Sequence, residues 1–129
     1  MKKIVVVALS LVFLVGCAAK QTTVVTPPIP GCRLTTTGTC DQLDVTSYRV
    51  LADAKKLLTD IGNSVTSGKL TLTATQKTLY NNLATASNIA NASWEVYHAG
   101  GSNGTELQTN TNNLSSAIST ATNQITVTK

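Results

Sequence analysis

The sequence predicts an all-α protein, a small antiparallel three-helix up-down-up bundle carried on a flexible N-terminal tether. Three stretches of about twenty residues repeat apolar side chains at alternating steps of four and three, which is the spacing of one helix face. Glycine-rich breaks separate these stretches, and connections this short favour antiparallel neighbours. The chain of 129 residues has room for about one such domain, expected at 32–129 with helices near 41–62, 74–98 and 105–125.

The first predicted helix has the clearest amphipathic pattern. Its main apolar stripe consists of Leu43, Ser47, Val50, Ala54, Leu57 and Ile61, widened by Leu51, Leu58 and Val65. Asp41 and Asp44 lie at the positive end of the helix dipole. Gly62 and Gly68 indicate where the helix ends.

The second predicted helix begins at a capping box formed by Thr73 and Gln76. Its seam consists of Leu79, Leu83, Ala86, Ala90, Ser93 and Tyr97, with Ile89, Trp94 and Val96 expected to fill out the C-terminal half. Alanine and serine in the seam require the neighbouring helices to approach closely. Gly100 and Gly101 end the helix.

The third predicted helix has a regular seam but poor intrinsic propensity. The seam consists of Leu107, Thr111, Leu114, Ile118, Ala121 and Ile125. Thr105 and Gln108 form a second candidate capping box, whereas residues 109–113 are Thr and Asn, which disfavour helix. This helix should therefore form only by packing on the other two. An oligomeric coiled coil is the alternative architecture, but the glycine breaks disfavour long rods, so we expect a monomer.

The N-terminus has the pattern of a secretory signal. Met1-Lys2-Lys3 precedes an apolar run from Ile4 to Val15, which is shorter than the roughly 17 to 25 residues of a membrane span. Leu14-Val15-Gly16-Cys17 at its end resembles the lipobox of bacterial lipoproteins. The resemblance implies a signal peptide at 1–16, cleaved by signal peptidase II, and an acylated Cys17 as membrane anchor. A retained transmembrane anchor is the alternative.

The residues after Cys17 bear on location and reach. In enterobacterial lipoproteins an aspartate directly after the cysteine retains the protein at the inner membrane, and this chain has Ala18 there. The resemblance therefore favours lipid anchoring in the outer membrane, on its periplasmic or surface face. Residues 17–31 are polar and proline-punctuated, and 14 of them could extend about 40 Å as a tether.

The chain has three cysteines, and lipidation of Cys17 leaves an even pair. Cys32 and Cys40 would then lie in an oxidising compartment, where a disulfide across the short intervening loop is sterically easy. Two free thiols are the alternative. A metal site is disfavoured because the pair has no CxxC spacing and no nearby histidine.

The residues that could carry chemistry are few. The single histidine, His98, follows Glu95 on one helical face, where the two could bind a metal or move a proton. This pair falls short of a metal site unless Asp41 or Asp44 adds ligands. The glycine-rich turn at 100–104 lacks the lysine of a phosphate-binding loop, and no serine lies in a nucleophile elbow. We therefore expect neither an enzyme nor a cofactor or metal. Removing Lys2 and Lys3 lowers the net charge from +4 to +2, which implies no nucleic-acid partner.

Antiparallel packing would gather several aromatic residues at the end where the tether attaches. These are Tyr48, Trp94, Tyr97 and His98, beside Leu107. They form either a contact patch for a partner or the end of the bundle's own core. A C-terminal lysine such as Lys129 also joins murein lipoprotein to peptidoglycan, but that family is one long heptad helix, so we expect a plain terminus.

The pattern as a whole resembles the short lipoproteins of bacterial envelopes. That resemblance implies a location but no particular activity. We expect a non-enzymatic structural or adaptor role in an envelope assembly, whose protein partner the sequence does not identify. The alternative is a binding module for a small apolar or lipid ligand held between alanine-lined helices. A phage or plasmid protein acting in lysis or exclusion is a third hypothesis.

Overall fold

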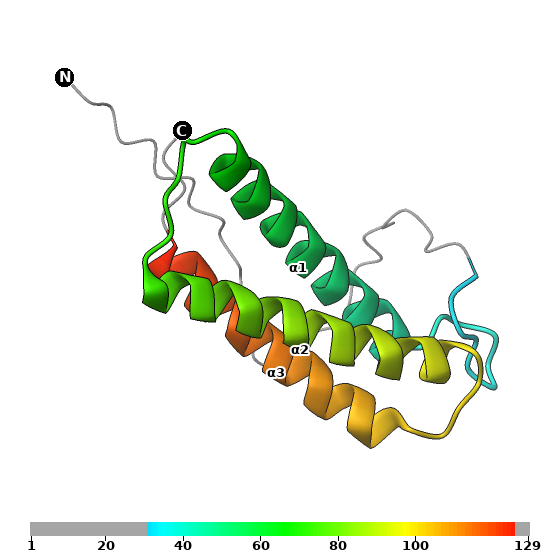
Figure 1. The fold of residues 1–129 in the computed structure, drawn as a ribbon. Helices are drawn as coiled ribbons and strands as arrows, with labels where there is room; N and C mark the ends of the chain where they lie inside the picture. Colours follow the sequence, from blue (N-terminus) through cyan, green and yellow to red (C-terminus); the bar gives the residue numbers. More distant parts are fainter. Residues whose placement is uncertain (1–30, 126–129) are drawn as a thin grey trace.

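The computed structural model describes residues 31–125, and these form the predicted three-helix bundle. Its helices are α1 (Gln42–Thr66), α2 (Ala74–His98) and α3 (Gly104–Gln124), and each contacts the other two (Figure 1). The predicted signal peptide, Cys17, the tether as far as position 30 and Lys129 lie outside the described residues. No helix within residues 31–125 is long and apolar enough to cross a membrane.

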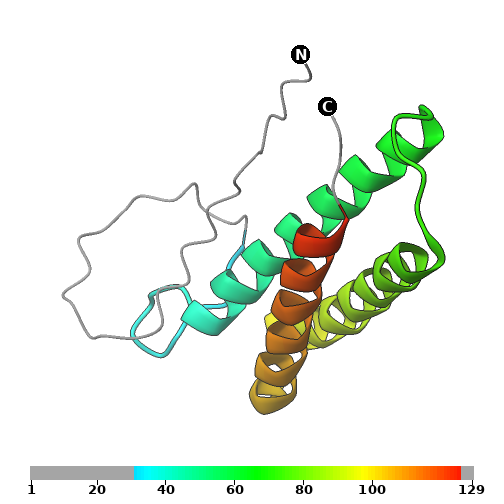
Figure 2. The ribbon, with the colours of Figure 1, turned by 90° about the vertical axis from the view of Figure 1, so that its left-hand side faces the viewer.

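The helices alternate in direction, so that three chain segments meet at each end. At one end α1 begins, α2 ends and α3 begins, with the loop at 31–41 beside them (Figures 1 and 2). At the other end α1 is joined to α2 by residues 67–73, from which Leu70 and Leu72 pack against the core. The first end, called the loop end below, holds almost all of the long-range polar contacts described below.

The core is built from small and medium-sized side chains. Its buried hydrophobic members are Leu51, Ala54, Ile61, Leu83, Ala90, Leu107, Leu114, Ile118, Ala121 and Ile125. All six seam residues predicted for α3 are buried, which confirms that this helix packs along its full length. Buried Thr111 donates a 2.9 Å hydrogen bond to buried Ser47, so α3 and α1 are also joined by a polar contact.

The C-terminal cap of α1 corrects the predicted end of that helix. Gly62 does not end α1, because a helical glycine costs only about 1 kcal/mol and Ile61 beside it is fully buried. The helix instead ends in a Schellman motif at Gly68, whose φ is +72°. There Gly68 N–H donates to the Val65 carbonyl and Lys69 N–H to the Ser64 carbonyl.

At the N-termini, one predicted capping box is confirmed and the other is wrong. Thr73 and Gln76 exchange both bonds of the box. Thr105 lies inside α3. The N-cap of α3 is Asn103, whose side chain accepts no hydrogen bond from the backbone N–H groups of the helix. Asn103 is held by a different contact, because its Nδ2 donates to the Ser93 carbonyl at the end of α2.

Two apolar residues predicted to fill out the C-terminal half of α2 do not. Ile89 and Val96 are 50% and 55% exposed, because the seam of α2 runs through Leu83, Ser87, Ala90 and Ser93 on the other side. Val65, predicted to widen the α1 stripe, is also 40% exposed. The outer side of α2 therefore carries apolar side chains that the bundle does not use.

Candidate functional site

The four predicted patch residues lie together at the loop end. Trp94 contacts Tyr48 with ring centroids 5.4 Å apart and stacks on His98 with centroids 4.6 Å apart. Tyr97, on the neighbouring face of α2, instead contacts Arg33 from the loop. Tyr48 is 39% exposed, whereas the other three are half-buried and Leu107 is fully buried. Most of this cluster is thus used in closing the end of the bundle.

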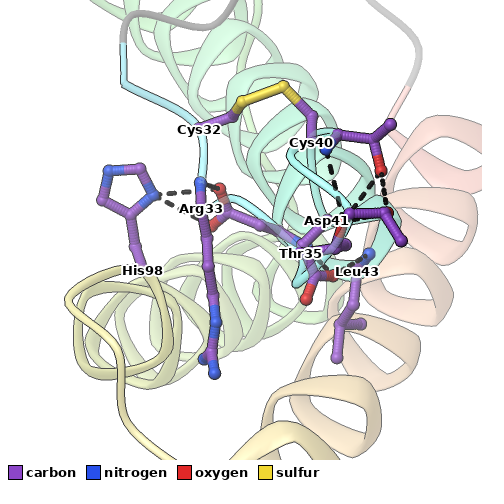
Figure 3. Close-up of a disulfide and its surroundings, with 10 residues drawn as sticks. Cys32, Arg33, Thr35, Cys40, Asp41, Leu43 and His98 are labelled. Carbon is purple, nitrogen blue, oxygen red and sulfur yellow. Dashed lines mark hydrogen bonds and ion pairs between the residues drawn. A yellow bond between two sulfur atoms is a disulfide. The ribbon is translucent and has the colours of Figure 1, made fainter.

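A buried carboxylate is the centre of the polar contacts. Asp44 is fully buried, and both of its carboxylate oxygens lie 3.0 Å from Nδ1 of His98, whose side chain is 26% exposed. The Arg33 backbone N–H donates to the same carboxylate at 2.8 Å, and Trp94 Nε1 donates to the Asp44 carbonyl oxygen. A buried carboxylate requires such partners, because leaving it unpaired costs several kcal/mol. Figure 3 shows the His98 ring turned toward the Arg33 backbone beside the disulfide loop.

Arg33 is the residue that the sequence analysis missed. Its Nη1 donates to the carbonyls of Tyr97, at 2.8 Å, and Gly101, at 2.6 Å, and its guanidinium lies 4.1 Å from the centre of the Tyr97 ring. A cation is favoured there because the carbonyls at a helix C-terminus carry partial negative charge. An arginine between two cysteines directly before a helix was the available signal, since such a loop brings it against the bundle end.

Asp41 joins the N-terminus of α1 to the end of α2. Its carboxylate accepts from the backbone N–H groups of Leu43 and Asp44 and, at 2.7 Å, from the Tyr97 hydroxyl. Burial raises the pKa of Asp41, but these hydrogen bonds and the charge of Arg33 outweigh burial and hold its pKa below the usual value. The hydrogen bond to Asp41, together with burial, raises the pKa of Tyr97.

The predicted cysteine pair is seen at disulfide distance. Cys32 and Cys40 are joined across the loop with their Cα atoms 5.6 Å apart (Figure 3). Inside the loop, Thr35 N–H donates to the Thr39 carbonyl and Gly38 N–H to the Thr35 carbonyl. Asp41 N–H donates to the Arg33 carbonyl, so the loop closes directly onto the N-cap of α1. The result is a small ring that holds Arg33 against the bundle.

Of the candidate catalytic and metal residues, His98 is brought against Asp44 but not against Glu95. Glu95 accepts a hydrogen bond from Asn91, whereas His98 bonds to Asp44, so the two are not partners. Among residues 31–125 no three His, Cys, Asp or Glu side chains are placed to hold a metal ion. No hydrogen bond within that range joins His98 to a serine, threonine or cysteine that it could activate as a nucleophile.

The described residues form two shallow surface hollows. Both are open to solvent, and most of the residues that line them are Asn, Ser and Thr. The first, of about 300 Å³, lies between α2 and α3 and is lined by Asn82, Thr85, Ala86, Ile89, Asn110 and Asn113. Such a hollow gives no support to an apolar ligand held between the helices.

Comparison with known protein families, with curated proteins and with solved structures finds no match to this chain.

Proposed function

We propose that this chain is a non-enzymatic bacterial envelope lipoprotein that presents a small helical bundle as a structural or adaptor component. The observation that carries the proposal is the lipobox-like Leu14-Val15-Gly16-Cys17 directly after a basic start and an apolar run. Acylation of Cys17 would anchor the protein firmly, because each buried CH₂ of an acyl chain contributes about 0.8 kcal/mol. The absence of aspartate at Ala18 favours the outer membrane.

The geometry of the loop end supports a role as a tethered domain. The first described residues are held at one place, because the Cys32–Cys40 ring and the Arg33 contacts fix them against the ends of α2 and α1. A tether joined at Gly31 would therefore present the bundle from its loop end. At that end Tyr97 bonds to Asp41 and His98 Nδ1 is engaged by Asp44, as a structural closure requires, although the buried Oδ1 of Asn103 has no hydrogen-bond partner.

The test of the anchor is to replace Cys17 by Ser and fractionate cells that express the full chain. We expect the C17S chain to remain unprocessed or to leave the membrane fraction, and globomycin to cause the unsubstituted precursor to accumulate. Ala18→Ser is the matched control and should leave processing unchanged. A C17S chain that matures to the same size and stays in the membrane would contradict the lipoprotein proposal.

Sorting is tested in the same cells. In an enterobacterial host, Ala18→Asp should move the protein from the outer to the inner membrane fraction on a sucrose gradient. The Ala18→Ser chain should stay in the outer membrane. An unsubstituted chain found in the inner membrane would contradict the outer-membrane assignment while leaving the anchor itself intact.

A further inference from the structure

We propose that Asn103 is a site of spontaneous modification, at which the backbone of the following glycine converts the asparagine into aspartate or isoaspartate. Asn103 ends the loop after α2, and Gly104 is the first residue of α3. The reaction requires water as its co-reactant and no enzyme. It is independent of the lipid anchor, because every protein group that takes part lies within the described residues.

The reaction is an attack of the backbone on the side chain. The Gly104 backbone nitrogen loses its proton to solvent and forms a bond to Cγ of Asn103, which closes a succinimide ring. The bond between Cγ and Nδ2 breaks, and Nδ2 takes up a proton and leaves as ammonia. Water then opens either carbonyl of the ring, which gives aspartate or isoaspartate. One water is consumed for each ammonia released, and no atom is oxidised or reduced.

Glycine after asparagine is the sequence feature that favours this attack. A side chain on the following residue crowds its backbone nitrogen and restricts the rotation that ring closure requires, whereas glycine does neither. Asn103 is the only asparagine of the chain that a glycine follows. Every other asparagine precedes a residue with a side chain, so the sequence selects this position.

The secondary structure also favours Asn103 over the other asparagines. Each of the others lies inside α1, α2 or α3, where the N–H of the next residue donates to the carbonyl four residues before it. Gly104 begins α3, and the N–H groups of a first helical turn have no acceptor within their own helix. The nitrogen that attacks Asn103 is therefore not engaged in the helical hydrogen-bond ladder.

The Asn103 side chain is weakly held in its closed position. Its Nδ2 donates to the Ser93 carbonyl at 3.0 Å, whereas its buried Oδ1 has no hydrogen-bond partner, which costs about 1 to 3 kcal/mol. The Asn103 ψ of +32° must change before the Gly104 nitrogen can reach Cγ. The attack therefore follows a transient opening of the first turn of α3, which has no side-chain cap to oppose fraying.

Arg33 controls how readily this opening occurs. Its Nη1 donates to the carbonyls of Tyr97 and Gly101, so it holds the loop between α2 and α3 against the bundle. The same loop contains Gly100, whose φ is +103°, and two consecutive glycines give the backbone wide freedom once that contact is broken. Loss of the Arg33 guanidinium should therefore free the loop and accelerate the reaction.

Either product removes a contact between α2 and α3. A carboxylate at neutral pH has no hydrogen to donate, so the bond to the Ser93 carbonyl is lost and two oxygens face each other instead. Isoaspartate also diverts the main chain through Cγ, which displaces the Asn103 carbonyl that accepts from Leu107 N–H at 2.9 Å. The modification therefore loosens the start of α3 at the loop end.

Incubation of the full chain, purified in detergent, in mildly alkaline buffer tests the proposal. Peptide mapping by mass spectrometry identifies each asparagine that has exchanged its NH₂ group for OH, and a protein-isoaspartate methyltransferase measures isoaspartate. We expect conversion at Asn103 to be about tenfold faster than at any other asparagine. Conversion at Asn103 no faster than elsewhere would overturn the proposal.

Asn103→Gln is the matched control for the chemistry. It keeps the carboxamide but lengthens the side chain by one methylene, so that attack by the Gly104 nitrogen would close a larger and less favourable ring. We expect the N103Q chain to lose most of the isoaspartate formed by the unsubstituted chain. Equal isoaspartate in the two chains would place the reaction elsewhere and overturn the assignment to Asn103.

The effect of the fold is measured against a synthetic peptide of residues 99–108. The folded chain should react less than about a hundredfold more slowly than the peptide, a ratio equivalent to an opening free energy below about 2.7 kcal/mol. Stronger protection would overturn the proposal, because the closed loop would then prevent the attack.

The role of Arg33 is tested by two arginine variants with the same readout. Arg33→Ala should raise the rate at Asn103 by about threefold or more, whereas Arg49→Ala, at an exposed position of α1, should leave it unchanged. Equal rates in R33A and R49A would overturn the conclusion that the loop held by Arg33 must open before the attack.

Discussion

Removing the His98 imidazole should destabilise the bundle far more than removing one partner of the exposed ion pair between Lys56 and Asp60. Lys56 and Asp60 are 2.7 Å apart, but their side chains are 70% and 52% exposed, and such pairs contribute about 0 to 1 kcal/mol. Asp44 is fully buried and loses its only ionisable hydrogen-bond donor among the described residues when His98 becomes Ala. Breaking a fully buried pair costs about 3 to 5 kcal/mol.

The partial exposure of His98 reduces that figure. Its side chain is 26% exposed, so water can reach part of the vacated position, and the Arg33 N–H still donates to the Asp44 carboxylate. We therefore expect His98→Ala to cost about 2 kcal/mol. In a domain of this size, that cost corresponds to a fall in Tm of about 8 to 16 °C.

Denaturation of the chain from Gly31 onward, monitored by circular dichroism, measures the change in unfolding free energy. Asp60→Ala is the control and should lower the free energy of unfolding by well under 1 kcal/mol. In an Asp44→Asn background the loss caused by H98A should shrink, because the buried charge is already gone. Equal losses for H98A and D60A would refute the conclusion that the buried pair closes this end of the bundle.

Three further predictions follow from the core, the loop and the pKa values. Ile118 is only 4% exposed, so Ile118→Ala should lower the free energy of unfolding by about 2 to 5 kcal/mol. An unchanged midpoint of urea denaturation would contradict the packing of α3. Intact mass after alkylation without reductant should show Cys32 and Cys40 unlabelled, whereas double labelling would rule out the disulfide. Tyr97→Phe should cost about 1 to 2 kcal/mol near neutral pH, through the lost bond to Asp41. The lowered pKa of Asp41 means that its contribution is lost as pH falls through its folded-state pKa, below 3.8. The raised pKa of Tyr97 means that the tyrosine contribution is lost as pH rises through a folded-state pKa above 10.0. The difference in unfolding free energy between the unsubstituted chain and the Y97F variant should therefore narrow at both extremes, and a difference independent of pH would contradict this assignment.

The sequence predicted the parts of the fold that depend on periodicity. The α3 seam from Leu107 to Ile125 is buried at every predicted position, because a three-and-four spacing leaves only one face to turn inward. The predicted α2 seam also faces the bundle, since Leu83, Ala90 and Ser93 are buried. Periodicity could not decide how wide the buried face of α2 is, and Ile89 and Val96, expected to fill it out, are instead exposed.

The sequence was enough to predict which aromatic residues gather at the loop end, but not which hydrogen bonds form there. Antiparallel topology is enough to bring Trp94 and His98 near the start of α1, and the structure places both there. That Asp44 is fully buried could not be foreseen, since an aspartate in a first helical turn is normally solvated and stabilised by the helix dipole alone. Its burial follows from the loop that brings Arg33 across it, a contact between two segments that have no shared sequence pattern.

The polar contacts at the loop end also bear on how this core selects one arrangement. Ala54, Ala90 and Ser87 contribute little volume to the interior, so at these positions apolar packing opposes a shift of the helices less than larger side chains would. Hydrogen bonds do not tolerate such a shift, because a displacement of one helical turn is about 5.4 Å and removes the partner altogether. The pair between Asp44 and His98 fixes α1 against α2 in this way. We infer that this pair specifies the register of the bundle more than its total stability, which is the role best attested for buried polar groups.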